Sequence, residues 1–210
     1  FFLEEKEIQF QLNNTSIAYA QSCYNVGHVY LDMKQNEKAE PAYVEAKNLF
    51  EKLLGKAHPF YANACSDLAI IFFRLGQYEK AEQLIIETKE TRAKIHGSQS
   101  AEYAASCNNL SELYTEMGLY KKAEPLLLES KEIVSRVHTT EHQEYAQSCN
   151  NLGRLIMYMG VNEKAENFYL EAKAIRERIL KKEHPDYTKS FINLGVLYTL
   201  LGQYEKAETY

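Results

Sequence analysis

A segment of 42 residues recurs along the whole chain, and this repeat limits what the chain can fold into. Tyrosine stands at one position of every repeat, and an alanine within a Lys-Ala-Glu triplet follows 20 residues later. The tyrosines are Tyr19, Tyr61, Tyr103, Tyr145 and Tyr187, and the alanines are Ala39, Ala81, Ala123, Ala165 and Ala207. Repeats of about 20 to 50 residues are typical of solenoids, propellers and arrays, in which each repeat buries its apolar face against its neighbours.

Apolar residues within one repeat follow the spacing of two helices. In the fourth repeat, the residues from Cys149 to Ile156 place their apolar members on one helical face. A second amphipathic run covers 165–179. Gly160 separates the two runs, and a glycine there can adopt the positive φ that ends a helix before a tight turn. Propeller blades would need alternating strands and a Trp-Asp signature, and the chain has no tryptophan. We therefore predict two helices per repeat.

The repeat resembles the tetratricopeptide repeat. It reads Cys/Phe-x2-Leu-Gly-x2-Tyr and then Gly-x-Tyr-x2-Ala, as in 191–198 and 76–85. Eight residues beyond the usual ~34 lengthen the second helix and its exit loop. Together with Leu-Gly-Lys-Ala-His-Pro at 54–59 and Glu-His-Pro-Asp at 183–186, this looks like the longer variant found in kinesin light chains and in bacterial signalling proteins. The resemblance implies an all-α, right-handed α-solenoid that binds proteins and is not an enzyme.

The repeat also sets the expected organisation, which is a single solenoid domain over 1–210. Residues 1–18 are the second helix and loop of a preceding repeat. Four complete repeats follow at 19–60, 61–102, 103–144 and 145–186, and a truncated fifth at 187–210. Both ends fall inside a repeat, without the polar capping helix that solenoids normally carry. We therefore expect a longer parent protein, and uncapped ends that would allow end-to-end self-association.

Composition excludes several classes of partner. The net charge of −5 does not suggest the clustered basic surface of a nucleic-acid-binding protein. No apolar run approaches the ~18 residues of a membrane span. The first six residues lack the basic flank and apolar stretch of a signal peptide. We expect a cytoplasmic protein with no nucleic-acid or membrane partner.

The cysteines follow the repeat and do not converge on one point. They are Cys23, Cys65, Cys107 and Cys149, in a column whose fifth member is Phe191. Zinc sites use ligand pairs about two to four residues apart, whereas this spacing spreads the thiols along a solenoid. Of the two interpretations, buried reduced thiols or a metal or disulfide site, we favour buried thiols. The sequence predicts no metal site, no cofactor and no catalytic group.

The histidines are also distributed by the repeat. Three of them, His58, His142 and His184, share the loop position before a first helix, where imidazole can cap the helix. His96 and His138 share the end of the second helix, where a cation suits the helix dipole. Only His28 stands apart, in the presumed groove.

One polar column does not look like packing. Six residues after each tyrosine stand Asn25, Asp67, Asn109, Asn151 and Asn193. The family resemblance puts this polar ladder on the concave face lined by first helices, where tetratricopeptide proteins bind partners. Because an amide both donates and accepts, a row of Asn can pair with the backbone of an extended peptide. The alternative is a solvated polar face that serves solubility.

Neighbouring columns complete the predicted groove, with Asn108, Asn150, Arg154, Tyr158, Lys189, His28 and Arg74. The last two repeats are the more apolar and basic, which favours ligands with an acidic residue beside a bulky apolar one. We predict a scaffold that holds an extended peptide or partner helix, as an adaptor, cargo-binding or sensor module. The alternative is a regulatory subunit or arm of a multidomain enzyme whose catalytic domain lies outside this chain.

Overall fold

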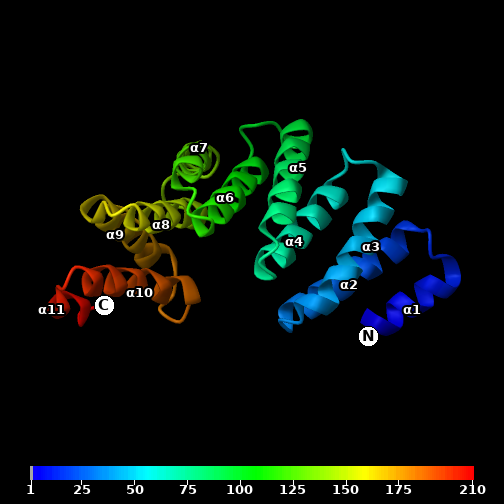
Figure 1. Cartoon of the computed structure of the whole chain (residues 1–210), viewed down its shortest axis with the longest axis horizontal. Coiled ribbons are helices and arrows are strands. Elements are labelled where there is room, and N and C mark those ends of the chain that lie inside the picture. Colours follow the sequence, from blue (N-terminus) through cyan, green and yellow to red (C-terminus); the bar gives the residue numbers. More distant parts are fainter. Residues whose placement is uncertain (1) are drawn as a thin grey trace. The chain divides into compact units, whose positions relative to one another are not determined.

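The computed structural model describes residues 2–210, and helices dominate this part of the chain, which contains no strand (Figure 1). The first helix of each repeat is α2 (Ile17–Asp32), α4 (Pro59–Arg74), α6 (Ala101–Glu116), α8 (Gln143–Tyr158) and α10 (Pro185–Leu200). The second helices are α1 (Phe2–Asn13), α3 (Asn36–Leu54), α5 (Tyr78–His96), α7 (Tyr120–Val137), α9 (Asn162–Ile179) and α11 (Tyr204–Ala207). The predicted all-α fold of tandem helical hairpins is confirmed. Among the described residues, no helix combines the length and apolarity that a membrane span requires.

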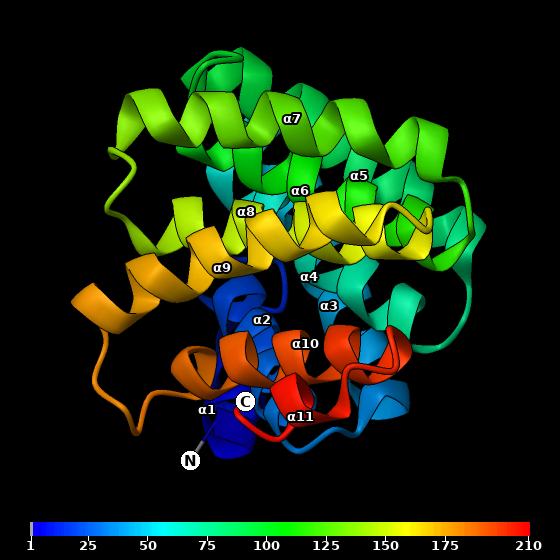
Figure 2. The ribbon, with the colours of Figure 1, turned by 90° about the vertical axis from the view of Figure 1, so that its left-hand side faces the viewer.

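The chain forms two compact units, which are described separately. Unit 1 ends at Ser98, and unit 2 is Gln99–Tyr210. In unit 1, α2 packs against α1 and α3, and α4 packs against α3 and α5. In unit 2, each helix from α6 to α11 packs against the next, and α8 also contacts α6 and α10 (Figure 2). Packing between sequence neighbours is typical of solenoid repeats. That the whole chain is one domain stays a prediction.

A residue with positive φ follows each first helix, as predicted. The values are 71° at Gly76, 72° at Gly118, 80° at Gly160 and 70° at Gly202. Lys34 takes the same place in the first repeat with φ 58°, a conformation that residues with a Cβ rarely adopt. The turn is therefore kept where the glycine is absent.

The predicted role of three histidines as helix caps is confirmed. The Nδ1 atoms of His58 and His184 each accept a hydrogen bond at 3.1 Å from the backbone N–H two residues later, and His142 does so at 3.3 Å. Ser16 and Ser100 cap the other two first helices through their hydroxyls. These side chains satisfy N–H groups that would otherwise lack a partner at the start of a helix.

The four cysteines lie in the core, as predicted, with no exposed surface and no disulfide. Beside each of them, a tyrosine of the first helix donates a hydrogen bond to a glutamate of the second helix. The pairs are Tyr19–Glu45 (2.6 Å), Tyr61–Glu87 (2.7 Å), Tyr103–Glu129 (3.1 Å) and Tyr145–Glu171 (2.9 Å). These bonds tie the two helices of a repeat together. The sequence analysis recognised the tyrosine column but not its acceptors.

A column of small residues lets first and second helices approach closely. A Cβ at Gly27 would lie 3.0 Å from the Tyr43 ring, and a Cβ at Gly153 would lie 2.7 Å from the Tyr169 ring. The corresponding pairs in the second and third repeats are Ala69 with Ile85, and Ser111 with Leu127. The largest side chain therefore stands opposite glycine, and smaller ones stand opposite alanine or serine.

Candidate binding site on the first helices

A cavity of about 340 Å³ lies among three first helices of unit 2. Equivalent repeat positions on α6, α8 and α10 lie close together there, because α8 contacts both of the other helices. The lining residues are Ala105, Asn108, Asn109, Glu112, Gln147, Asn150, Asn151, Arg154, Lys189 and Asn193. The lining therefore includes seven residues predicted for the groove, and its only apolar member is an alanine.

The polar ladder of unit 2 is hydrogen-bonded and only partly exposed. Gln147 Nε2 donates to Asn151 Oδ1 at 2.7 Å, and Asn193 Nδ2 donates to Asn150 Oδ1. Asn150 itself is buried, with 2% of its surface exposed. Asn151 and Asn193 are therefore not freely solvated, because amides one helical turn apart, or on adjacent helices, reach one another. Their role in binding stays a prediction.

Two polar atoms beside the ladder have no hydrogen-bond partner. Asn108 Oδ1 and Arg154 Nε are both buried and unsatisfied. Arg154 is held by acidic side chains of α6, with Nη2 3.2 Å from Glu112 Oε1 and Nη1 4.0 Å from Glu116 Oε1. A buried polar atom without a partner costs about 1–3 kcal/mol. A ligand that supplies the missing partners would recover part of that cost.

A buried arginine, which we did not predict from the sequence, is hydrogen-bonded to a residue that contacts the ladder. Arg176 of α9 has no exposed surface. Its Nη2 donates to Gln147 Oε1 at 2.7 Å and its Nη1 donates to Ser190 Oγ at 3.0 Å. Burial lowers the pKa of Arg176, and the charge of Asp186 opposes that shift. The chain of bonds from Arg176 through Gln147 to Asn151 fixes the orientation of a ladder amide.

Comparison of the repeats could have revealed this arginine. Its column holds Phe50, Arg92 and Val134 in the other repeats, so it is apolar in two of four, and a buried charge there needs a polar partner. We had extended the apolar stripe of the second helix to Ile179, which is instead 38% exposed. Leu53 and Val137 are also exposed at this position, which lies at the end of the second helix.

In unit 1 the corresponding ladder residues are engaged with each other. Tyr24 Oη donates to Asp67 Oδ2 at 2.5 Å, and His28 Nε2 lies 3.4 Å from the same oxygen. Burial raises the pKa of Asp67, while the Tyr24 hydrogen bond and the nearby His28 oppose the rise. Gln21 Nε2 donates to Asn25 Oδ1 at 3.2 Å, as its counterpart does in unit 2. Asp67 and Asn25 therefore both accept hydrogen bonds from neighbouring side chains, as Asn151 does in unit 2.

Comparison with known families assigns the chain. The family model described as tetratricopeptide repeat matches residues 16–87, 64–136 and 146–210. The chain belongs to the tetratricopeptide repeat family. This fold is a protein-interaction scaffold. No curated protein matches the chain significantly in sequence.

Solved structures share the tetratricopeptide fold of this chain. BtubC (BKLC) from P. vanneervenii is 23% identical with a TM-score of 0.79, over 99% of this chain and 83% of that one. A putative kinesin light chain of Podosopora anserina, with nearly identical TPR-like repeats, is 23% identical with a TM-score of 0.74, over 92% of each chain. A Rap protein complexed with Competence and Sporulation Factor is 16% identical with a TM-score of 0.77, over 92% of this chain and 51% of that one. At these identities the likeness shows the fold alone.

Five predicted groove residues of this tetratricopeptide repeat protein lie outside the cavity: Asn25, His28, Asp67 and Arg74 in unit 1, and Tyr158 in unit 2. Arg74 is exposed in the last turn of α4. Tyr158 is 48% exposed at the end of α8, and its ring stacks on Tyr120 with centroids 6.2 Å apart. Neither residue lines the cavity of unit 2. Any part they play in binding is separate from that cavity.

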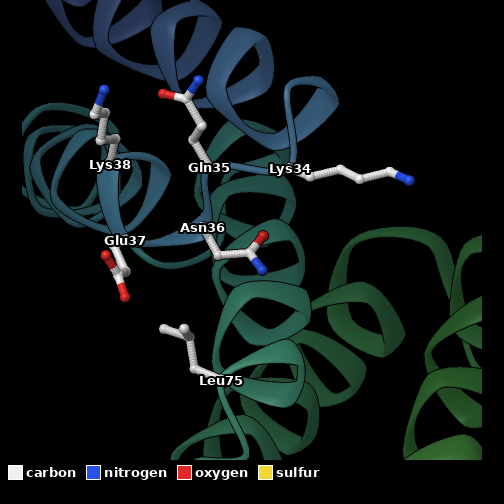
Figure 3. A pocket seen from close by; sticks show the side chains of 6 residues that line it. All are labelled: Lys34, Gln35, Asn36, Glu37, Lys38 and Leu75. Carbon is white, nitrogen blue, oxygen red and sulfur yellow. The ribbon is translucent and has the colours of Figure 1, made fainter.

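A second hollow, of about 410 Å³, lies at the turn between α2 and α3 of this repeat protein. Figure 3 shows its lining side chains: Lys34, Gln35, Asn36, Glu37, Lys38 and Leu75. The polar side chains point in different directions and do not converge (Figure 3). Asn36 stands where the other repeats have Tyr78, Tyr120, Asn162 and Tyr204. Gln35 Oε1 and Asn36 Oδ1 are buried there without partners.

Proposed function

We propose that the first helices of unit 2 hold an extended peptide or partner helix in the cavity among α6, α8 and α10. The observation that supports this most is the unsatisfied Asn108 Oδ1, which is buried beside a row of amides on three helices. A peptide backbone offers alternating N–H and C=O groups, and amide side chains can pair with both. An N–H of the ligand would satisfy Asn108, while the Nδ2 groups of Asn109 and Asn151 would donate to its carbonyls.

The flanks of the cavity favour a particular ligand chemistry. Arg154 and Lys189 bring positive charge to the lining, and Glu112 offsets part of it. Along α10, Ile192, Val196 and Leu200 are 56%, 45% and 67% exposed at successive helical turns. Exposed apolar side chains in a row can receive an apolar ligand residue. We therefore expect ligands with an acidic residue beside a bulky apolar one.

We further propose that the chain acts by binding and not by catalysis, as a cytoplasmic adaptor, cargo-binding or sensor module. In unit 1, Asn25 and His28 would contribute to the same kind of binding, with Asp67 accepting hydrogen bonds. Nucleic acid and membranes are not expected as partners, and end-to-end self-association is a separate proposal.

Site-specific photo-crosslinking tests the location of binding. The ligand is a peptide selected from a random-sequence phage library on the immobilised chain. A photoreactive residue at Ala105, which is exposed and lines the cavity, should capture this peptide. The same residue at Leu128, which is 47% exposed on the second helix α7, is the matched control. Capture at Leu128 without capture at Ala105 would contradict the proposal.

A further inference from the structure

Two histidines and a glutamate converge where α7 leads into α8. His138 follows the last residue of α7, His142 precedes the first residue of α8, and Glu144 lies in the first turn of α8. One ligand atom from each of the three lies within 4.8 Å of the others. In the part of the chain that the structure describes, no second group of His, Cys, Asp and Glu side chains meets this condition.

The repeat explains why this cluster occurs only once. The position of His138 holds Leu54, His96 and Leu180 in other repeats. The position of His142 holds Ser16, His58, Ser100 and His184. Only the loop between α7 and α8 has histidine at both positions. His142 caps α8 as predicted, and His138 lies at the predicted end of the second helix, but their juxtaposition goes beyond those roles.

The side chains of the cluster lie close together, and one of their nitrogens has no hydrogen-bond partner. The two imidazole rings stack with centroids 4.3 Å apart and an interplanar angle of 13°. His138 Nε2 lies 3.0 Å from Glu144 Oε2. The pair lacks hydrogen-bond geometry, and this nitrogen is buried without a hydrogen-bond partner. An unsatisfied nitrogen beside a carboxylate oxygen is an arrangement that a cation can complete.

The backbone between the two histidines is strained at Thr139. Thr139 has φ 95°, at the position where Gly55 and Gly97 have φ 82° and 86°. Glycine adopts positive φ readily, but for a β-branched residue it is a genuine outlier. Strained residues of this kind persist where the surrounding structure requires them, often at ligand sites.

We propose that His138, His142 and Glu144 bind a divalent transition metal, with zinc as the expected ion. Imidazole nitrogen and carboxylate oxygen are zinc ligands, and three protein ligands leave a fourth position for water. Two nitrogens on one zinc ion lie at most ~4.2 Å apart, since each Zn–N bond is ~2.1 Å. The ligand atoms now lie within 4.8 Å, and the stacked rings would turn out of their parallel arrangement to share an ion, because imidazole lone pairs lie in the ring plane. The ion would join α7 to α8, and its charge would suit the C-terminal end of α7.

Metal binding must compete with the helix cap of His142. Its Nδ1 accepts from Glu144 N, so in the metal-free chain the proton of the neutral ring is on Nε2. A neutral imidazole has one lone pair, and coordination through either nitrogen removes the cap hydrogen bond. The length of that bond, 3.3 Å against 3.1 Å at His58 and His184, indicates the weakest of the three histidine caps.

Zinc titration of the 210-residue chain, in competition with a chromogenic zinc chelator, tests this proposal. We expect one zinc ion per chain. His138→Leu and His142→Ser introduce residues found at the same positions in other repeats, and serine still caps the helix at Ser16. Each variant should bind zinc at least tenfold more weakly, while His96→Leu, the matched control, should bind as the natural chain does. Circular dichroism should show all three variants folded.

Cobalt spectroscopy identifies the ligands independently. Co²⁺ bound to two imidazoles and a carboxylate gives visible d–d bands without a thiolate charge-transfer band, and loss of these bands in His138→Leu supports the site. Three results would overturn the proposal: no stoichiometric zinc binding, unchanged affinity in both histidine variants, or a thiolate band that reveals cysteine ligands. None of these results bears on peptide binding by the first helices.

Discussion

At the scale of single residues, the repeated thiol shows how burial controls chemistry. Burial raises the pKa of Cys23 and Cys65 to about 11 and that of Cys149 to about 12. Nearby lysines pull these values down, and the glutamate that accepts from each tyrosine pushes them up. Since the thiolate is the reactive form, these cysteines are protected from oxidation and alkylation at neutral pH.

Thiol reactivity checks this directly. At pH 8, the native cysteines should react with a disulfide reagent at least ~100-fold more slowly than an exposed cysteine of ordinary pKa ~8.5, because both the thiolate fraction and access are reduced. Ala57→Cys, in an exposed loop of unit 1, provides that comparison within the same chain. Rates in urea should converge for all thiols. Fast labelling of Cys65 in the folded protein would show that the column is open to solvent.

The sequence predicted the roles of residues that depend on local structure. It did not predict the roles that depend on contacts with other helices. The histidine caps follow from one loop position, and the structure confirms them. The partners of Arg176, which are Gln147 and Ser190, lie on other helices. A repeat alignment can flag a charge in an apolar column, but only tertiary packing shows which groups satisfy it.

At the scale of helices, the fit between first and second helices depends on paired side-chain sizes. Gly27 and Gly153 leave room for tyrosines, and the pairs Ala69–Ile85 and Ser111–Leu127 replace them in the other repeats. The column of small residues is visible in the sequence. The sequence did not reveal the tyrosine ring that each glycine faces, because that contact joins residues on separate helices.

Substituting alanine for two glycines of this column should change the free energy of unfolding in opposite directions. Gly153→Ala should lower the free energy of unfolding by ~1–3 kcal/mol, because its Cβ would lie 2.7 Å from the buried Tyr169 ring. Gly195→Ala should raise it by ~0.5–1 kcal/mol, because alanine favours the helix and no atom lies nearer than 3.8 Å. Urea unfolding measures both. Equal effects of the two substitutions would contradict the steric explanation.

A second variant separates steric overlap from other effects at Gly153. The pair Ala69 and Ile85 occupies these two positions in the second repeat. In a Tyr169→Ile background, Gly153→Ala should therefore cost little or become favourable, since the ring is gone. An unchanged cost in that background would show that the ring is not the cause.

At the scale of the whole molecule, repeats that contact only their neighbours should respond locally to damage. Ala123→Leu places a larger side chain at a position with no exposed surface and should destabilise by ~1–3 kcal/mol. Hydrogen exchange should show lost protection concentrated in unit 2. Ala174→Leu, at an exposed position of α9, is the control and should change little. An equal loss of protection in all repeats would contradict local coupling.

The sequence predicted which residues line the proposed binding site, but not the hydrogen bonds that they make with one another. The 42-residue spacing places the asparagines of α6, α8 and α10 together, and the structure gathers them around one cavity. The sequence could not show that Asn151 and Asn193 are already hydrogen-bonded, because those bonds depend on rotamers and on the distance between helices. A ligand must therefore pair with groups that lack a partner, such as Asn108 Oδ1, which is buried and would reach the ligand after its side chain rotates.

Calorimetric titration of the library-selected peptide into the natural chain and into the Asn109→Ala/Asn151→Ala double variant tests the central claim most directly. Each lost neutral hydrogen bond should weaken binding by ~0.5–1.5 kcal/mol, and the double variant should lose about the sum or more. Asn167→Ala, at an exposed position of the second helix α9, should bind as the natural chain does. Thermal melts should show both variants folded. Unchanged affinity in the folded double variant would mean that the polar ladder is only a hydrated surface.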